Sequence, residues 1–106
     1  MTTADTIARL AAAYRAARDA SRAAQRASSV ALDALYLTLP TPSEDVFAAA
    51  RLAAGLPTAA EESALWERAD TLGRQLGALL RRIARANNVA LPAGVSDREL
   101  ADLHIG

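Results

Sequence analysis

Residues 58–87 read TAAEESALWERADTLGRQLGALLRRIARAN, and this stretch decides the fold. Its apolar residues recur at alternating steps of four and three, the heptad spacing of a helix that packs along one seam. The seam consists of Leu65, Ala69, Leu72, Leu76, Leu79, Ile83 and Ala86. We therefore expect a helix over about residues 59–87. Thr58, with Glu61 three residues later, forms a capping box that marks its beginning.

The segment before it, about residues 3–39, contains neither Gly nor Pro and is rich in Ala, which favours one long helix. Residues spaced by three or four give it one face of mostly small side chains. This face consists of Ile7, Leu10, Tyr14, Ala17, Ser21, Ala24, Ser28 and Ala31. Gly73 and Gly77 lie beside the seam of the other long helix. We expect them to let the two helices approach closely at this small-residue face.

Two short helices complete the predicted fold. Thr41 is expected to cap a helix over about residues 42–54, with Pro42 in its first position and Gly55 just past its end. Ser96 and Glu99 open the other short helix, about residues 97–104. No sustained strand pattern occurs. The sequence thus predicts one all-α domain, residues 1–106. The two long helices form an antiparallel hairpin, and the short helices cover its ends.

Apolar side chains surround the end of the first helix instead of following one stripe. Such a helix is buried on more than one side, and in a chain this small one side can belong to a second copy. We therefore predict a homodimer that completes a helical bundle. Trp66 is interpreted as either a core anchor, which we favour, or an interface residue. The candidate interface residues are Val30, Leu32, Leu35, Tyr36, Leu37, Leu39 and Trp66.

Composition excludes several classes of function. The chain has 106 residues, no formal net charge, no Cys and one His. Disulfide frameworks, thiolate metal sites and multi-His metal sites are therefore not expected. His104 is interpreted as a helix C-terminal residue and not as a catalytic base. The acidic pairs at residues 44–45 and 61–62 are interpreted as helix-capping charges. We predict no catalytic residue, metal or cofactor.

Arginines form a stripe on each long helix. Guanidinium groups suit phosphate contacts, so the two stripes could follow a nucleic-acid backbone, although a solvated or inter-helix face is the interpretation that we favour. The candidates for contact with phosphate or an acidic partner are Arg15, Arg18, Arg22, Arg26, Arg74, Arg81 and Arg85. An enzyme that binds an anionic metabolite in an Arg-lined pocket is a third alternative.

Residues 96–103, SDRELADL, resemble the opening helix of a helix-turn-helix motif. Such a motif reads DNA through a second, recognition helix, which does not follow here. A capped terminal helix that packs Leu100 and Leu103 on the bundle accounts for the same residues.

We find no signal peptide and no apolar run of about 18 residues, so we expect a cytoplasmic protein without a membrane span. Abundant Ala and Arg with no Lys is typical of GC-rich genomes, and we interpret the source as bacterial. The sequence favours a non-enzymatic protein-interaction function, as a small homo-oligomeric adaptor, inhibitor or assembly subunit. Nucleic-acid association through the Arg stripes is the alternative.

Overall fold

The computed structural model describes residues 2–39 and 41–106, and over these residues its regular structure is entirely helical. The helices are α1 (Thr3–Thr38), α2 (Glu44–Ala53), α3 (Ala59–Ala86) and α4 (Asp97–Ile105). The predicted all-α class is therefore confirmed, and each helix lies within two residues of its expected bounds.

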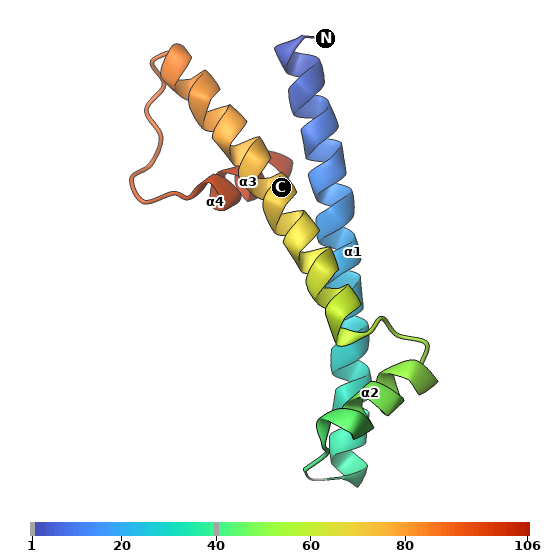
Figure 1. Ribbon diagram of the computed structural model, residues 1–106. Helices are drawn as coiled ribbons and strands as arrows, with labels where there is room; N and C mark the ends of the chain where they lie inside the picture. The colour runs from blue at the N-terminus through green and yellow to red at the C-terminus, as the bar shows by residue number, and fades with distance from the viewer. Residues whose placement is uncertain (1, 40) are drawn as a thin grey trace.

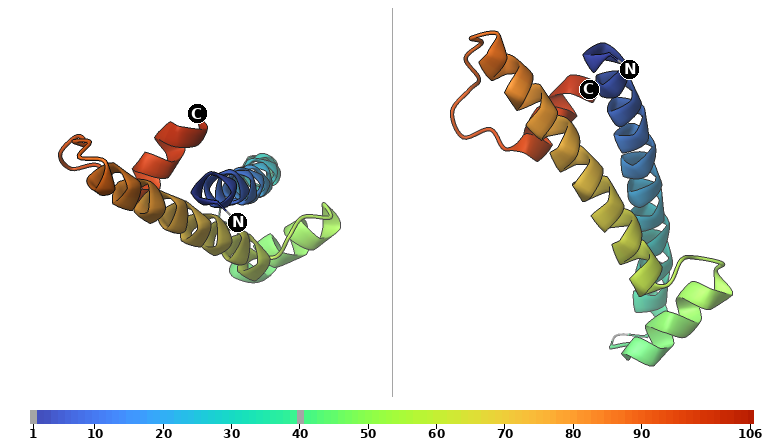
Figure 2. Two further views of the ribbon diagram at one scale, coloured as in Figure 1. Left: turned by 90° about the horizontal axis from the view of Figure 1, so that it is seen from above. Right: turned by 45° about the horizontal axis from the view of Figure 1, so that its top comes forward.

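The two long helices, α1 and α3, pack against each other and set the shape of the molecule (Figure 1). They lie close together where α3 begins and diverge towards the N-terminus of α1. α4 packs where they diverge and contacts both of them, whereas α2 lies against the C-terminal part of α1 (Figure 2). The short helices are therefore at opposite ends of the α1–α3 contact.

The small-residue face of α1 is buried, as the spacing predicts. Ala17, Ser21, Ala24 and Ser28 are all less than a tenth exposed. On α3, Ala69 is 1% exposed. Small side chains on both helices allow a close approach, but each of them buries little apolar area.

The larger apolar core lies at the α4 end. Tyr14, Leu76 and Ala101 are fully buried there, one from each of α1, α3 and α4. Ile105 and a ring of partly buried residues complete the cluster. That ring consists of Ile7, Leu10, Ala11, Leu72 and Leu80. Tyr14 and Leu76 are the largest side chains that are fully buried over the described residues, so this core is thin.

The two helical glycines make a close approach, but not to the residues we expect. A Cβ at Gly77 would lie 1.7 Å from the carbonyl oxygen of Asp97, in the first turn of α4. A Cβ at Gly73 would lie 2.5 Å from Cδ of Arg98 and 2.8 Å from Cε1 of Tyr14. The expectation that both glycines meet the small-residue face of α1 is wrong for Gly77, which meets only α4, whereas Gly73 meets Tyr14 of that face as well as Arg98 of α4. Their absent side chains make room for α4 and for the ring of Tyr14.

The cap of α2 also differs from the prediction. Ser43, and not Thr41, is the N-cap: its hydroxyl accepts a hydrogen bond from the Val46 amide at 3.4 Å. Pro42 consequently lies before the helix. This start places Glu44 and Asp45 in the first turn, where the helix dipole favours negative charge. Leu39 has the extended backbone expected before a proline, whereas the predicted stop at Pro40 lies outside the described residues.

α4 does not use the face that its sequence suggests. Leu103 is 70% exposed, whereas Ala101 and Ile105 are buried. The two buried residues are four apart and therefore lie on one side of the helix. Arg98 and Asp102, which flank this side, face α1 and α3 and make polar contacts. The orientation of α4 is therefore set by these polar contacts together with the burial of Ala101 and Ile105.

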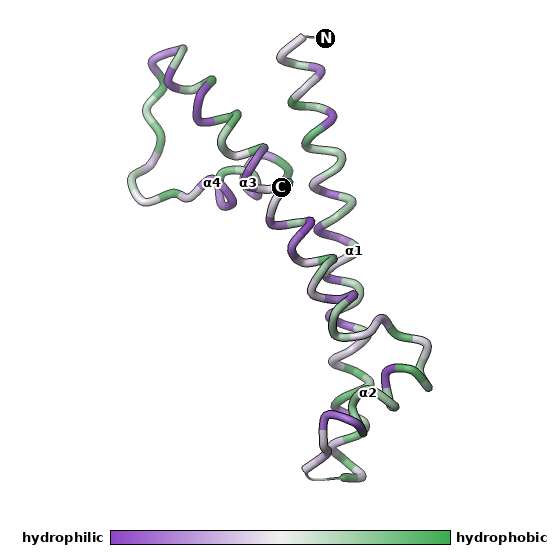
Figure 3. Tube along the Cα trace, viewed as in Figure 1, coloured by the Kyte–Doolittle hydropathy of each residue, from purple (hydrophilic) through white to green (hydrophobic). Residues whose placement is uncertain are grey.

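The molecule is elongated for its size. Its radius of gyration is 18.3 Å and its extents are 57 × 31 × 19 Å, whereas a compact chain of this length has a radius of about 13 Å. The extension follows from α1, which reaches past α3 to carry α2 at its far end (Figure 1). In Figure 3 the last turns of α1 and much of α2 are coloured as hydrophobic.

Candidate functional site

The apolar residues at the end of α1 divide into two groups. One group packs on α2: Leu32 lies beside Phe47, and the ring of Tyr36 meets Phe47 edge-on at 5.7 Å between centroids. The other group is left largely in solvent over the part of the chain that the structure describes, since Val30 is 71% exposed and Leu37 is 89% exposed. Leu35 is partly buried and Leu39 is 40% exposed. One side of this segment is therefore covered by α2, and another side is open.

Trp66 is not part of the core. It is 47% exposed and lies beside Gln25, Arg51 and Glu62, so the core position that we favour is wrong. Its place one step off the heptad seam turns it out of the α1–α3 contact. Val30 follows Ser28 by two residues, and Ser28 points at Glu62. At about 100° per residue, Val30 therefore points away from α3, and it does not share a surface with Trp66.

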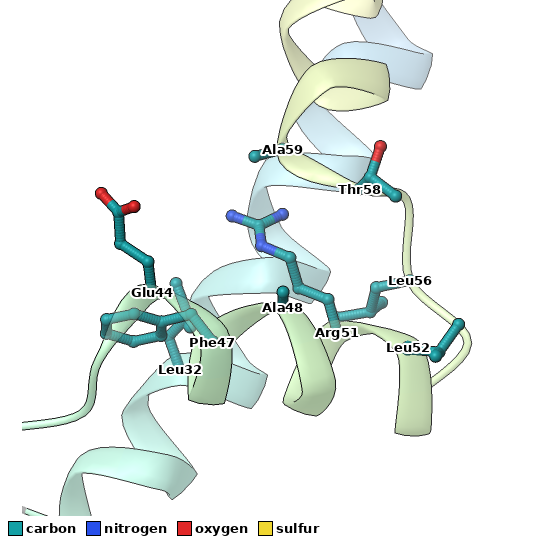
Figure 4. Close-up of a pocket in the computed structure, with 9 residues that line it drawn as sticks. All are labelled: Leu32, Glu44, Phe47, Ala48, Arg51, Leu52, Leu56, Thr58 and Ala59. Carbon is teal, nitrogen blue, oxygen red and sulfur yellow. The ribbon is translucent and has the colours of Figure 1, made fainter.

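A pocket of about 460 Å³ lies where α2 meets α1 and the start of α3 (Figure 4). Most of its lining is apolar, including Leu32, Phe47, Leu52 and Leu56. The side chain of Arg51 crosses it from α2 towards Thr58 and Ala59, as Figure 4 shows. Its volume falls in the range of sites that hold small ligands or anchor side chains.

Arg51 holds α2 in place through what we call the Arg51 cluster, Ser28, Arg51 and Glu62. Its Nη1 donates to Oε2 of Glu62 at 2.7 Å, to Oγ of Ser28 at 3.2 Å and to the carbonyl of Pro57 at 3.4 Å. Ser28 in turn donates to Glu62 at 2.8 Å. The hydrogen bond from Arg51 lowers the pKa of Glu62, with Ser28 acting in the same direction against the effect of burial. The cluster joins α1, α2 and α3.

A second polar cluster holds α4, and we call it the Tyr14 cluster: Tyr14, Arg18, Asp70, Arg98 and Asp102. The Tyr14 hydroxyl donates to Oδ1 of Asp102 and accepts from Nε of Arg98. Arg98 also donates to Asp70 at 3.0 Å, and Arg18 contacts Asp102 at 3.4 Å. Burial raises the pKa of Tyr14, and its hydrogen bond to Asp102 acts in the same direction. The phenol is therefore held neutral between charged partners.

The predicted Arg stripes do not remain continuous surfaces. Arg18 is 9% exposed and belongs to the Tyr14 cluster. Arg81 pairs with Asp97 at 2.8 Å and also donates to the carbonyl of Val95. Arg74 pairs with Asp70 at 2.9 Å, and Arg15 donates to the carbonyl of Ile105 at 3.2 Å. Exposed side chains remain at Arg22, Arg26 and Arg85.

Sequence reasoning missed the carboxylates that engage these arginines, Asp70, Asp97 and Asp102. One signal was present for α4: Arg98 and Asp102 are four residues apart and therefore share a helix face. Tyr14 gave another, because a tyrosine on a buried face requires a hydrogen-bond partner for its hydroxyl. Neither signal identifies the partner helix, since these contacts join residues about 30 to 90 positions apart.

The described part of the chain holds no group of three or more His, Cys, Asp or Glu side chains that could bind a metal ion. His104 is exposed in the last turn of α4, at the helix C-terminal position expected from the sequence. Among the helices of residues 2–39 and 41–106, none combines the length and apolar character required to cross a membrane.

The comparisons with known proteins give no relative: no family model, curated protein or solved structure matches this chain. Class and function therefore rest on the residues themselves. The fold defines an all-helical protein with a polar, internally paired end at α4 and an apolar, open end at α2.

Proposed function

We propose that this protein is a non-enzymatic protein-interaction module that assembles as a homodimer through the apolar end of α1. One observation carries the proposal. The chain exposes 6946 Å² of surface, whereas a compact monomer of 11.1 kDa exposes about 5,650 Å². The excess of about 1,300 Å² exceeds the roughly 800 Å² that each partner contributes to a standard protein–protein interface.

The distribution of exposed apolar side chains supports the same proposal. Val30, Leu37 and Leu52 are each more than 70% exposed, and all three lie at the α1–α2 end. A single exposed Leu needs no explanation, but several large ones at one end of a small chain mark an interaction surface. Burial of each such side chain contributes about 1.5–3 kcal/mol, which would supplement the thin internal core.

The state of the ionisable groups favours binding over catalysis. Asp70, Asp102 and Glu62 each accept from arginines in the contacts that hold helices together. A carboxylate fixed in this way is a poor general base, because its lone pairs are occupied by the arginines; for Glu62, the hydrogen bond from Arg51 also lowers the pKa. Arg51, which lines the pocket, is likewise neutralised by Glu62. The Arg-lined pocket of an enzyme for anionic metabolites therefore finds little support.

Nucleic-acid association finds less support than protein binding for a related reason. A phosphate-tracking surface needs several free cationic side chains in a row. Three of the seven candidate arginines, Arg18, Arg74 and Arg81, are engaged with aspartates. Absorbance at 260 nm in the experiment below reports whether the remaining exposed arginines bind nucleic acid.

Light scattering coupled to size-exclusion chromatography tests the proposal. We expect the wild-type protein to elute as a dimer with a protein-like absorbance spectrum. Leu37→Glu should elute as a folded monomer, because a buried unpaired carboxylate disfavours the interface. Leu103→Glu is the matched control: Leu103 is 70% exposed on α4, far from the apolar end, so this variant should remain dimeric. A monomeric wild-type protein, or a peak rich in nucleic acid that is lost at high salt, would overturn the proposal.

A further inference from the structure

One face of α1 contacts no other helix of the chain. Its residues alternate at steps of four and three, and every one of them is exposed. We call this set the open face: Ala16, Ala20, Ala23, Ala27, Val30, Ala34 and Leu37. α3 and α4 instead contact the side of α1 that carries Tyr14 and Ser28. The open face therefore lies on roughly the opposite side of α1 from the buried face, where its residues are exposed to solvent.

The spacing of the open face is that of a helix that packs on another helix. Alternating steps of four and three keep a seam in contact with a partner over several turns. The seam runs for 21 residues, or about 32 Å at 1.5 Å per residue. Val30 and Leu37 supply large apolar side chains at its C-terminal end, and alanines let a second backbone approach closely along the rest.

The charges of the chain indicate which partner fits this face. Residues 1–26 contain five Arg and two Asp, whereas residues 27–62 contain five acidic residues and one Arg. Two copies of α1 placed side by side in the same direction would oppose like charges. Within α1 itself the only charged residue after Arg26 is Asp33, so two copies in opposite directions would bring the arginines of one α1 towards Asp33 of the partner subunit. A second copy, antiparallel to the first, is therefore the complementary partner.

The charges that flank the seam, taken together with the burial of Val30 and Leu37, select a register. Asp19 is exposed on the same side as Arg26, but a register that pairs these two residues would leave Val30 and Leu37 opposite no residue of the open face. Arg26 and Asp33 are exposed, seven residues apart, and border the open face on the same side. If Ala27 faces Val30 of the partner subunit, Arg26 lies beside Asp33 of the partner subunit, and the symmetry makes this pair twice. If the helices shift by one heptad, Arg26 instead meets Arg26 of the partner subunit. The first register also places Ala20 opposite Leu37 of the partner subunit.

We infer that the open face of α1 is the dimer interface, formed by antiparallel packing of two α1 helices with Ala20 opposite Leu37 of the partner subunit. The inference rests on the proposed dimer and specifies its geometry. The exposed surface in excess of a compact monomer, about 1,300 Å², is larger than the roughly 800 Å² per partner that such an interface needs.

Cysteine cross-linking tests this geometry, and the chain has no Cys of its own. The variants are Ala20→Cys, Leu37→Cys and the double variant, oxidised mildly and resolved on a non-reducing gel. A disulfide requires Cα atoms within about 7 Å. In the antiparallel register equal residues lie 17 positions, or about 25 Å, apart along the axis. We therefore expect the double variant to form a covalent dimer and both single variants to remain unlinked, as should the exposed control Leu103→Cys.

Other outcomes separate this inference from the proposed function. Efficient linkage of Leu37→Cys alone would indicate parallel helices and overturn the inference, while the dimer itself would stand. No linkage in any variant of a protein that scatters light as a dimer would place the interface on another face. A wild-type protein that is monomeric would overturn both.

Charge reversal gives a second test that leaves the fold unchanged, because both side chains are exposed. Arg26→Asp should raise the dimer dissociation constant about tenfold, since it converts two attractive pairs into two repulsive ones. Arg26→Asp combined with Asp33→Arg should restore the wild-type value. Failure of the second change to restore affinity would contradict the register.

Discussion

The two ends of the α1–α3 pair each hold a short helix, but they differ in how completely their side chains are buried and paired. At the α4 end, the side chains of three helices satisfy one another: Tyr14 is fully buried, and its hydroxyl is hydrogen-bonded to two charged partners. At the α2 end, Arg51 joins three helices in a similar way, yet large apolar side chains remain in solvent beside it. The first end is complete within one chain, and the second is not.

This difference separates stability from assembly. A buried polar cluster rigidifies the packing around it and specifies one arrangement of helices. Each member of the Tyr14 cluster makes at least one polar contact, although Nε of Arg18 is buried without a hydrogen-bond partner. Exposed apolar surface does not specify an arrangement within the chain, because it favours burial against any complementary surface, including that of a second molecule. Substitutions at the α4 end should therefore change the free energy of unfolding, whereas substitutions on the open face should change the oligomeric state.

The largest expected effect on stability comes from Gly77→Ala. The added methyl group would overlap the backbone of Asp97, which cannot move without displacing α4. We expect a loss of about 3 kcal/mol in the free energy of unfolding, measured by urea denaturation. Gln75→Ala, an exposed change on the same helix, is the control and should be close to neutral. An unchanged stability in Gly77→Ala would show that α4 does not pack here.

A smaller effect is expected from Tyr14→Phe. Removal of the hydroxyl leaves Asp102 and Arg98 without a shared partner, at a cost of about 1–2 kcal/mol. Tyr36→Phe removes the same atom from a tyrosine that is 51% exposed, and it should cost almost nothing. Equal losses in the two variants would contradict the contrast between the two ends.

The smallest effect concerns pH and the docking of α2. The pKa of Glu62 is lowered by Arg51, so ionised Glu62 stabilises the folded state above its ordinary pKa of 4.5. This contribution is lost as the pH falls through the lowered folded-state value. Glu62→Gln should cost about 1 kcal/mol near pH 7, and its difference from wild type should shrink as the pH falls below 4.5.

Hydrogen exchange of the α2 amides, measured in wild type and in Glu62→Gln across this pH range, reports how firmly α2 is docked at each pH. Faster exchange in Glu62→Gln at pH 7 that converges with wild type at low pH is the expected pattern. A difference in exchange rate that does not change with pH would show that the ionisation of Glu62 does not hold α2 in place.

Much of the fold could be predicted because its signals are local. Heptad spacing on α3, the absence of Gly and Pro in α1 and the cap residues Thr58 and Ser96 each act within a few residues. The cap of α2 was misplaced because Thr41 and Ser43 are chemically equivalent as caps, and only the packed structure distinguishes them. The contact of Gly77 was misassigned since its partner, Asp97, comes from a helix 20 residues further along the chain.

The candidate site was predicted only in part. The apolar character of residues 30–39 is visible in the sequence, but the way α2 covers Leu32 and leaves Leu37 open depends on tertiary packing. The same holds for the arginines, because Arg18 and Arg22 look alike in a helix pattern and differ only in what α4 brings to them. The heptad spacing of the open face was present in the sequence, hidden by alanines that occur throughout α1.

The central claim is that the apolar end is an assembly surface, and the urea midpoint at two protein concentrations tests it most directly. Unfolding of a dimer releases two chains, so the midpoint of an obligate dimer rises with protein concentration. The account predicts a higher midpoint at about 100-fold higher concentration for wild type and a constant midpoint for Leu37→Glu. A wild-type midpoint that does not change with concentration would contradict it.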